Sequence, residues 1–148
     1  MDEPNGKTRF FEGRINSQQH LVKRNEGWGM SMEDEALYKN LIVWQKSMEL
    51  VKVVYALMSN FPNNERFRLC DQLSRAVISI PSNIAEGNGR GSKKDYSHFL
   101  SIARGSLYET MTQLEIAASL GYISETDIPK DTASAIRRML NSMISKLS

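Results

Sequence analysis

The chain has 148 residues and a mass of 16.8 kDa, with a formal net charge of +2 and 41% hydrophobic residues. This length fits one domain that buries a core, and no apolar stretch approaches the roughly 20 residues that a membrane-spanning helix needs. The first residues are too polar for a signal peptide. A single cysteine, Cys70, excludes an internal disulfide and suits a reducing compartment. We therefore expect a cytoplasmic protein.

Residues 1–39 differ from the rest of the chain. Glycines interrupt them repeatedly, and their apolar residues show no sustained period. Residues 1–40 hold six Lys/Arg and seven Asp/Glu, whereas residues 41–148 hold 13 and 10, so the positive charge belongs to the second part. We predict a polar, largely disordered extension over 1–39 and a folded domain over 40–148. Translation that begins at Met30 or Met32 is an alternative for the first segment.

The first helix of this domain is predicted from Leu41 to Asn60, with Asn40 as its N-cap and Pro62 just beyond its end. An apolar stripe with helical spacing is expected to face the core. It consists of Leu41, Trp44, Met48, Val51, Tyr55 and Met58, and Val54 and Leu57 widen it. Other apolar residues are expected to lie off the central seams and to favour self-association, namely Ile42, Val43, Leu50, Val53, Leu100, Leu107 and Met111.

The second helix is predicted from Asn64 or Leu69 to Glu86, and it carries an unusual number of polar residues beside its apolar stripe. These are Gln72, Arg75, Ser79, Asn83 and Glu86. Since an unsatisfied polar group beside a core costs about 1–3 kcal/mol, we predict that the five form a hydrogen-bonded structural network or an oligomer contact. Arg75 and Arg104 are expected to pair with Glu86 or Glu109, either within one subunit or between subunits. Pro81 removes one amide, so a kink or a compensating polar contact is expected.

The third helix is predicted from Ser92 to Leu120 and the fourth from Pro129 to Leu147. Ser92 and Asp95 form a possible capping box, and Gly121 marks the end of the third helix. Its inner stripe is expected to be Tyr96, Phe99, Ala103, Ser106, Thr110, Leu114 and Ala117. Ala103, Gly105 and Ser106 are small enough to let a neighbouring helix approach closely. Four helices with short connections and no strand predict an all-α, antiparallel up-down four-helix bundle.

Several segments resemble one known family. They are LIVWQKSMEL (41–50), the Phe61-Pro62 step, DQLSRAVISIPSNIAEGNGR (71–90), FLSIARGSLYE (99–109) and the turn at 120–123. In this order they are similar to the four-helix-bundle proteins encoded in intervening sequences of bacterial large-subunit rRNA genes. That family includes the accessory variability determinant of diversity-generating retroelements. The resemblance implies a homopentameric ring and suggests a reverse transcriptase as a protein partner.

A glycine-rich, basic turn follows the second helix. It is not a phosphate-binding loop of the usual kind, because its spacing differs and a helix rather than a strand precedes it. Lys93 and Lys94 nevertheless lie in the first turn of a helix, where the helix dipole disfavours cations by about 0.3–1 kcal/mol each. A phosphate bound at this helix end would offset that cost. We predict nucleic-acid contacts from Arg90, Lys93, Lys94, Arg137 and Arg138, with a flexible, solvated turn as the alternative.

Neither a catalytic set nor a metal site is predicted. Asp95 and His98 form a single i, i+3 pair and His20 lies in the extension, whereas a di-iron bundle needs several Glu and paired Glu-x-x-His motifs. We expect no cofactor and predict a non-enzymatic, oligomeric scaffold that binds RNA or DNA, a protein such as a reverse transcriptase, or both. One alternative is a self-assembling protein-interaction module of an rRNA intervening element without nucleic-acid binding. Another is a metal or small-molecule enzyme.

Overall fold

Four long helices account for most of residues 37–148, the part of the chain that the structure, a computed structural model, describes. The 3-10 helix η1 (Tyr38–Asn40) precedes α3 (Ile42–Met58), α4 (Leu69–Asn88), α5 (Lys93–Ser119) and α6 (Lys130–Leu147). Two further 3-10 helices, η2 (Asn63–Glu65) and η3 (Glu125–Asp127), lie in the connections. No strand occurs in residues 37–148, so the all-α prediction is confirmed for them. Residues 1–36 of the predicted extension lie outside the described residues.

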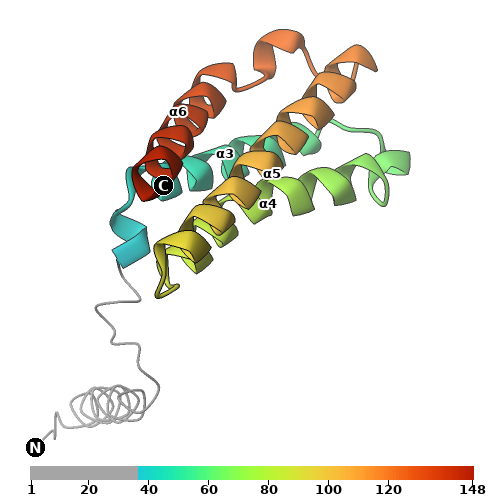
Figure 1. Ribbon diagram of the computed structural model, residues 1–148. Helices are drawn as coiled ribbons and strands as arrows, with labels where there is room; N and C mark the ends of the chain where they lie inside the picture. The colour runs from blue at the N-terminus through green and yellow to red at the C-terminus, as the bar shows by residue number, and fades with distance from the viewer. Residues whose placement is uncertain (1–36) are drawn as a thin grey trace, which may run out of the picture. The chain divides into compact units, whose positions relative to one another are not determined.

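Consecutive helices run in opposite directions (Figure 1). α4 packs against both α3 and α5, and α6 packs against α5 and α3. The end of the bundle that holds the α4–α5 turn therefore also holds η1, the start of α3 and the end of α6. Among the described residues, no helix is both long enough and apolar enough to cross a membrane.

With Leu69 rather than Asn64 as the start of the second helix, the helix ends differ from the predicted ones by two residues at most, and there is one capping error. Asn40 is not the N-cap of α3, because it ends η1 and Leu41 holds the cap position without a side-chain hydrogen bond. Ser92 does cap α5, since its Oγ accepts a hydrogen bond from the Asp95 amide at 3.1 Å. Gly121 has a φ of +78°, the left-handed conformation that commonly follows the last turn of a helix.

The core consists of aliphatic side chains where the four helices meet. The largest fully buried ones are Leu50, Leu73, Ile80, Ile84, Leu100, Leu107, Leu114, Ile136 and Leu140. The predicted stripes of α4 and α5 are confirmed over most of their length, for example at Ile80 and Leu114.

The predicted core face of α3 is confirmed only in part: Val54 is fully buried, and Leu41, Trp44, Val51, Leu57 and Met58 are partly buried against the core. The side chains that α3 buries are Val43, Ser47, Leu50 and Val54, whereas Trp44, Met48 and Val51 are only partly buried and Tyr55 is 46% exposed. The expectation that Val43, Leu50, Leu100 and Leu107 lie off the central seams is wrong for the same reason, because all four belong to the core. Ile42 and Val53 from that set are exposed. Both flanks of α3 are apolar, so its periodicity alone does not decide which flank packs inward.

Candidate functional site

The five polar residues predicted on α4 lie along one side of the helix, and the middle of this stripe contacts α5. The Ser79 and Ser106 hydroxyls lie 2.8 Å apart at hydrogen-bond distance. Asn83 donates from Nδ2 to Ser79 Oγ at 2.8 Å and to the Ser79 carbonyl at 2.7 Å. On α5, Thr110 Oγ1 donates to the Ser106 carbonyl at 2.8 Å. This polar cluster joins α4 to α5 immediately beside Pro81 and satisfies groups that would otherwise be partly buried without a partner.

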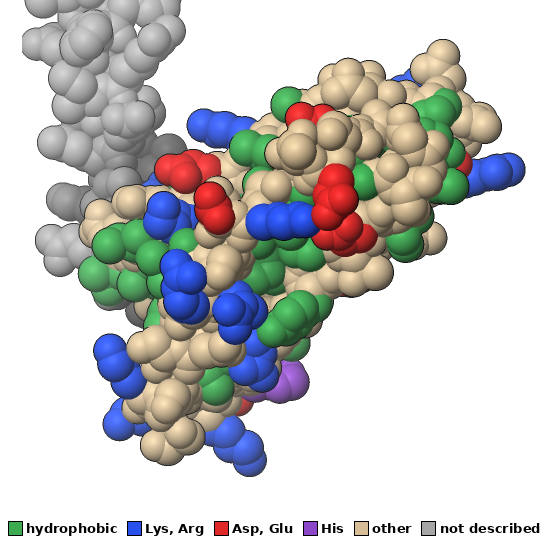
Figure 2. Space-filling view, turned by 90° about the horizontal axis from the view of Figure 1, so that it is seen from above, with side chains coloured by type: hydrophobic (Ala, Val, Ile, Leu, Met, Phe, Trp, Pro, Cys, Tyr) green, Lys and Arg blue, Asp and Glu red, His purple; other side chains and the backbone are tan. Residues whose placement is uncertain are grey.

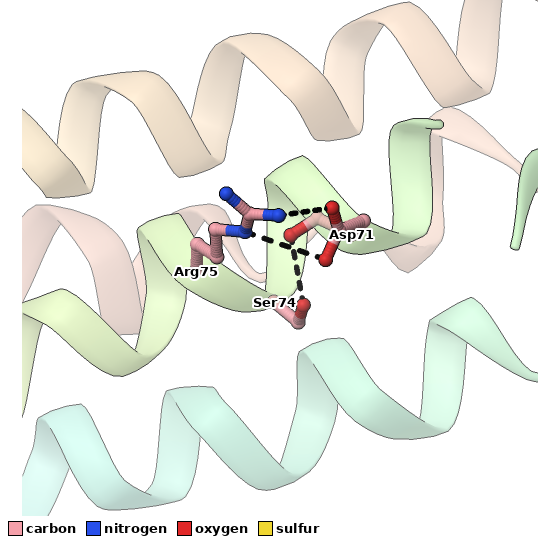
Figure 3. Close-up of polar contacts among 3 residues, drawn as sticks. All are labelled: Asp71, Ser74 and Arg75. Carbon is pink, nitrogen blue, oxygen red and sulfur yellow. Dashed lines mark hydrogen bonds and ion pairs between the residues drawn. The ribbon is translucent and has the colours of Figure 1, made fainter. Parts of the chain in front are cut away.

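The ends of the stripe are different, because there the charged side chains pair within α4 itself. Arg75 forms an ion pair with Asp71 one turn earlier, so the predicted pairing with Glu86 or Glu109 is wrong within the chain (Figure 3). Glu86 pairs instead with Arg90 at 2.8 Å. Arg75 remains 77% exposed and Glu86 52% exposed, and Gln72 is exposed as well. The stripe is therefore one structural contact flanked by two solvent-facing ion pairs.

The basic turn between α4 and α5 is held in place by close packing. A Cβ added at Gly87 would lie 2.8 Å from Phe99 Cβ and 2.9 Å from Tyr96 Cδ2, so this position requires glycine for the two helices to meet. The Arg90 guanidinium carbon lies 4.8 Å from the centre of the Phe99 ring, a cation–π distance. Lys93 and Lys94 are exposed in the first turn of α5. Arg90 is thus anchored, while both lysines project into solvent.

The two arginines predicted on α6 lie in the middle of that helix, away from the start of α5 in sequence. Arg137 is half-buried, which differs from the expected full exposure, and Arg138 is exposed and donates to Ser134 Oγ at 3.1 Å. Arg104 was not assigned to the binding set, yet it donates from Nη1 to Asn141 Oδ1 at 2.9 Å and so joins α5 to α6. Figure 2 shows a group of Lys and Arg side chains gathered on part of one face, with few Asp or Glu side chains between them.

A second candidate surface is apolar and runs between α3 and α4. Two hollows of about 320 and 410 Å³ lie along it. Their apolar lining comes from Trp44, Met48, Val51, Tyr55 and Met58 of α3 with Phe67, Cys70, Ile78, Pro81 and Ala85 on the other side. Phe67 is 84% exposed. We call this surface the α3/α4 groove. Sequence reasoning missed it because it assigned the α3 stripe to the core.

Two titratable side chains, Cys70 and Tyr122, have pKa values shifted by burial and by Glu65. Burial, and then the nearby Glu65 carboxylate, raise the pKa of the Cys70 thiol, which keeps it protonated and weakly nucleophilic. Tyr122 donates its hydroxyl to Glu65 Oε1 at 3.1 Å, and burial followed by this hydrogen bond raises the pKa of Tyr122. Within residues 37–148, no group of three or more His, Cys, Asp or Glu side chains is placed to hold a metal ion. His98 is exposed, and its ring packs against Phe99.

Comparison with known proteins supports the family resemblance noted in the sequence. Residues 39–142 match the family described as 23S rRNA-intervening sequence protein, and this range includes all of α3, α4 and α5 and most of α6. No curated protein matches the chain. Because the match covers more than half of the sequence and the region that it covers folds into four helices, the chain belongs to the 23S rRNA-intervening sequence protein family.

Proposed function

We propose that this protein is a non-enzymatic, homo-oligomeric scaffold of the cytoplasm that binds nucleic acid through the basic turn between α4 and α5. The observation that carries the proposal is the placement of Arg90, Lys93 and Lys94 around the N-terminus of a long helix. Among the described residues, neither lysine forms an ion pair. Two unpaired cations at the positive end of a helix dipole are unfavourable, and Asp95 in the same turn offsets part of this cost, so a bound phosphate would offset the rest.

The anchoring of Arg90 also supports a binding role. Its contacts with Glu86 and the Phe99 ring hold the guanidinium beside the turn, so it loses less side-chain entropy on binding than a free arginine would. Arg137 and Arg138 of α6 and the α5 residue Arg104 add positive charge on other parts of the bundle. Such contacts with phosphates give affinity without reading the base sequence.

Assembly would strengthen this modest patch. One chain carries a net charge of only +2, and a single small patch binds a polyanion weakly. The homopentameric ring implied by the family resemblance would repeat the turn five times on one particle, and linked weak sites bind a long polyanion far more tightly than one site. We propose this ring as the functional form, with the retroelement reverse transcriptase as a candidate partner that follows from the resemblance alone.

The α3/α4 groove favours a second candidate function, a protein-interaction module without nucleic-acid affinity. A helix that presents apolar side chains at i, i+3, i+4 and i+7 is the kind of ligand that such a groove accepts. This alternative predicts partner binding that is insensitive to salt, because apolar contacts rather than phosphate neutralisation would supply the affinity.

Fluorescence anisotropy with a labelled structured RNA and a DNA duplex across a salt series tests the main proposal. We expect binding of the unmodified protein to weaken steeply with salt. Lys93→Glu with Lys94→Glu should keep the fold and lower affinity at least about tenfold, and it should reduce the salt slope by about two because two phosphate contacts are lost. Lys52→Glu with Lys130→Glu makes the same charge change on α3 and at the start of α6 and serves as the matched control.

Equal losses in the two double variants would mean that overall charge, not the turn, drives binding. Absence of binding at low salt would reject the nucleic-acid scaffold and favour the protein-interaction module. Far-ultraviolet circular dichroism of each variant verifies that the helices are intact before affinities are compared.

A further inference from the structure

Acidic and basic side chains alternate along one side of α4, and their order is complementary in charge to the same order read in the opposite direction. We define the α4 crest as Asp71, Arg75, Ile78, Ser82, Glu86 and Arg90. Asp71 is half-buried and the other five are exposed, and Asp71, Ile78 and Ser82 also line the α3/α4 groove along its α4 side. The crest residues recur at intervals of three or four residues and therefore share one side of the helix. An acid precedes a base by one turn at both ends of the crest, in the Asp71–Arg75 and Glu86–Arg90 pairs. The signs along the crest thus read minus, plus, minus, plus.

This order is complementary to itself in an antiparallel arrangement. The midpoint between Ile80 and Pro81 is equally far along the helix from Arg75 and Glu86, and it is also equally far from Asp71 and Arg90. If a second α4 lies antiparallel across this midpoint, Arg75 of each chain meets Glu86 of the other. Asp71 of each chain then lies at the same level as Arg90 of the other chain, and these two side chains carry opposite charges. An arrangement of this kind is an isologous contact, in which the same surface is used by both copies.

The centre of the crest suits such a contact. Ile78 is 43% exposed, and in the same antiparallel register it lies level with Asn83 of the second copy, next to Ser82 on the crest. Ser82 is exposed, and its hydroxyl is already used, because it donates to the Ile78 carbonyl at 2.9 Å. A large apolar side chain beside a small residue of the second copy lets two helices approach closely, and this approach would remove Ile78 from water.

The charged side chains are available for this contact. Asp71 and Arg75 are 44% and 77% exposed, and Glu86 and Arg90 are 52% and 48% exposed. Each arginine is already oriented by its own acid one turn away, so a second carboxylate from another chain completes a network rather than ordering a free side chain. Charge networks of this type fix the register and orientation of helix pairs.

We propose that two copies of this chain associate through their α4 crests, antiparallel and about a two-fold axis, with reciprocal Arg75–Glu86 ion pairs between chains. The proposal goes beyond the ring suggested above, because a five-fold ring needs two different surfaces that fit each other, whereas the crest fits itself. The two contacts predict different stoichiometries. The crest alone gives a dimer, and the crest together with a closed ring gives an assembly with an even number of chains.

Charge reversal in trans tests the two-fold contact. Arg75→Glu places two acids opposite each other in every pair of identical chains, and Glu86→Arg places two bases there. We expect each variant by itself to self-associate at least about tenfold more weakly than the unmodified protein. An equal mixture of the two variants restores both interchain ion pairs, so the mixture should form heteropairs in equal amounts. Native mass spectrometry and analytical ultracentrifugation at low salt measure this, with one variant carrying a mass tag.

Two further variants keep the test independent of small changes in stability. Ser82→Trp fills the centre of the crest with a bulky side chain at an exposed position and should block association whatever the charges. Lys130→Glu removes a cation that lies on α6, outside the α4 crest, and pairs with Glu115 and Glu125, so this variant should associate as the unmodified protein does. Thermal unfolding confirms that all variants are folded.

The outcomes separate the two proposals. Heteropairs that form only in the mixture support the crest contact, and an even number of chains in the unmodified assembly supports it further. A mixture that stays unassociated, or single variants that associate normally, would overturn it. A lone pentamer that never doubles would reject the crest contact and keep the ring, whereas a dimer without pentamers would support the crest and reject the ring.

Discussion

The helices α3 and α5 both carry regular apolar stripes, yet the bundle uses those stripes differently. On α5 the predicted stripe is buried, with Ala103, Thr110 and Leu114 fully covered. On α3 the residues with the most regular spacing line the α3/α4 groove, while the adjacent flank with Val43, Leu50 and Val54 enters the core. On α5 the apolar flank of the stripe that holds Leu100 and Leu107 is buried as well, because α5 packs against both α4 and α6. Where two apolar flanks adjoin, as on α3, the neighbouring helices decide.

The largest expected effect is the difference in the loss of stability between substitutions on the two flanks of α3. Leu50→Ala should lower the free energy of unfolding by about 2–5 kcal/mol, because Leu50 is fully buried and truncation leaves a cavity. Tyr55→Ala in the α3/α4 groove should cost less than about 1.5 kcal/mol, because its side chain is 46% exposed. Urea unfolding of both variants measures the difference. A larger loss for Tyr55→Ala would place the core on the other flank of α3.

The next effect compares the close contact that Gly87 of α4 makes with α5 and the outer surface of α5 at Gly105. Gly87→Ala should lower stability by about 1–3 kcal/mol, because a methyl group there collides with Phe99 and Tyr96. Gly105→Ala is the matched control. Nothing lies within 4 Å of a Cβ added at Gly105, so alanine should stabilise the helix by about 0.4–1 kcal/mol. Thermal unfolding should therefore shift in opposite directions for the two substitutions.

The Gly105→Ala result also bears on the expectation that Ala103, Gly105 and Ser106 let a neighbouring helix approach α5 closely. Ala103 and Ser106 are buried, whereas Gly105 faces open space and lets no helix of the same chain approach. A loss of stability in Gly105→Ala would mean that another chain covers this surface in solution.

A smaller effect separates the middle of the α4 polar stripe from its end. Asn83→Ala removes two hydrogen bonds to Ser79 and should cost about 0.5–1.5 kcal/mol. Glu86→Ala removes an exposed ion pair and should change the stability of the monomer by less than about 0.5 kcal/mol. The comparison is made by chemical unfolding at low protein concentration. Equal losses would place Glu86 in the same network as Asn83.

The smallest effect concerns the opposite end of the bundle at high pH. Tyr122 has a raised pKa in the folded chain through burial and its bond to Glu65. Its contribution to stability is present below the unfolded pKa of about 10 and is lost as pH rises through the folded pKa, because ionisation ends the hydroxyl donation. Stability of the unmodified protein should therefore fall more steeply above about pH 10 than that of Tyr122→Phe. Identical pH profiles would contradict a role for this bond.

The sequence by itself determined the fold class, the approximate limits of four helices, the Ser92 cap and the glycine stop at Gly121. These features depend on local chemistry, since helix periodicity, capping and turn residues act within a few positions along the chain. It also identified the α4 polar stripe and the exposed lysines of the basic turn. The family assignment rests on the same segments, over residues 39–142.

Only the tertiary structure decided which flank of α3 is buried and which partners the polar residues take. Arg75 is an exception, because its pairing with Asp71 one turn earlier is a local i,i+4 contact that the sequence already contained. Ser79 and Ser106 are 27 residues apart and meet only because the two helices pack side by side. The physical reason is that burial and hydrogen bonding between helices depend on how whole faces fit together, and a one-dimensional pattern with two acceptable faces does not contain that choice.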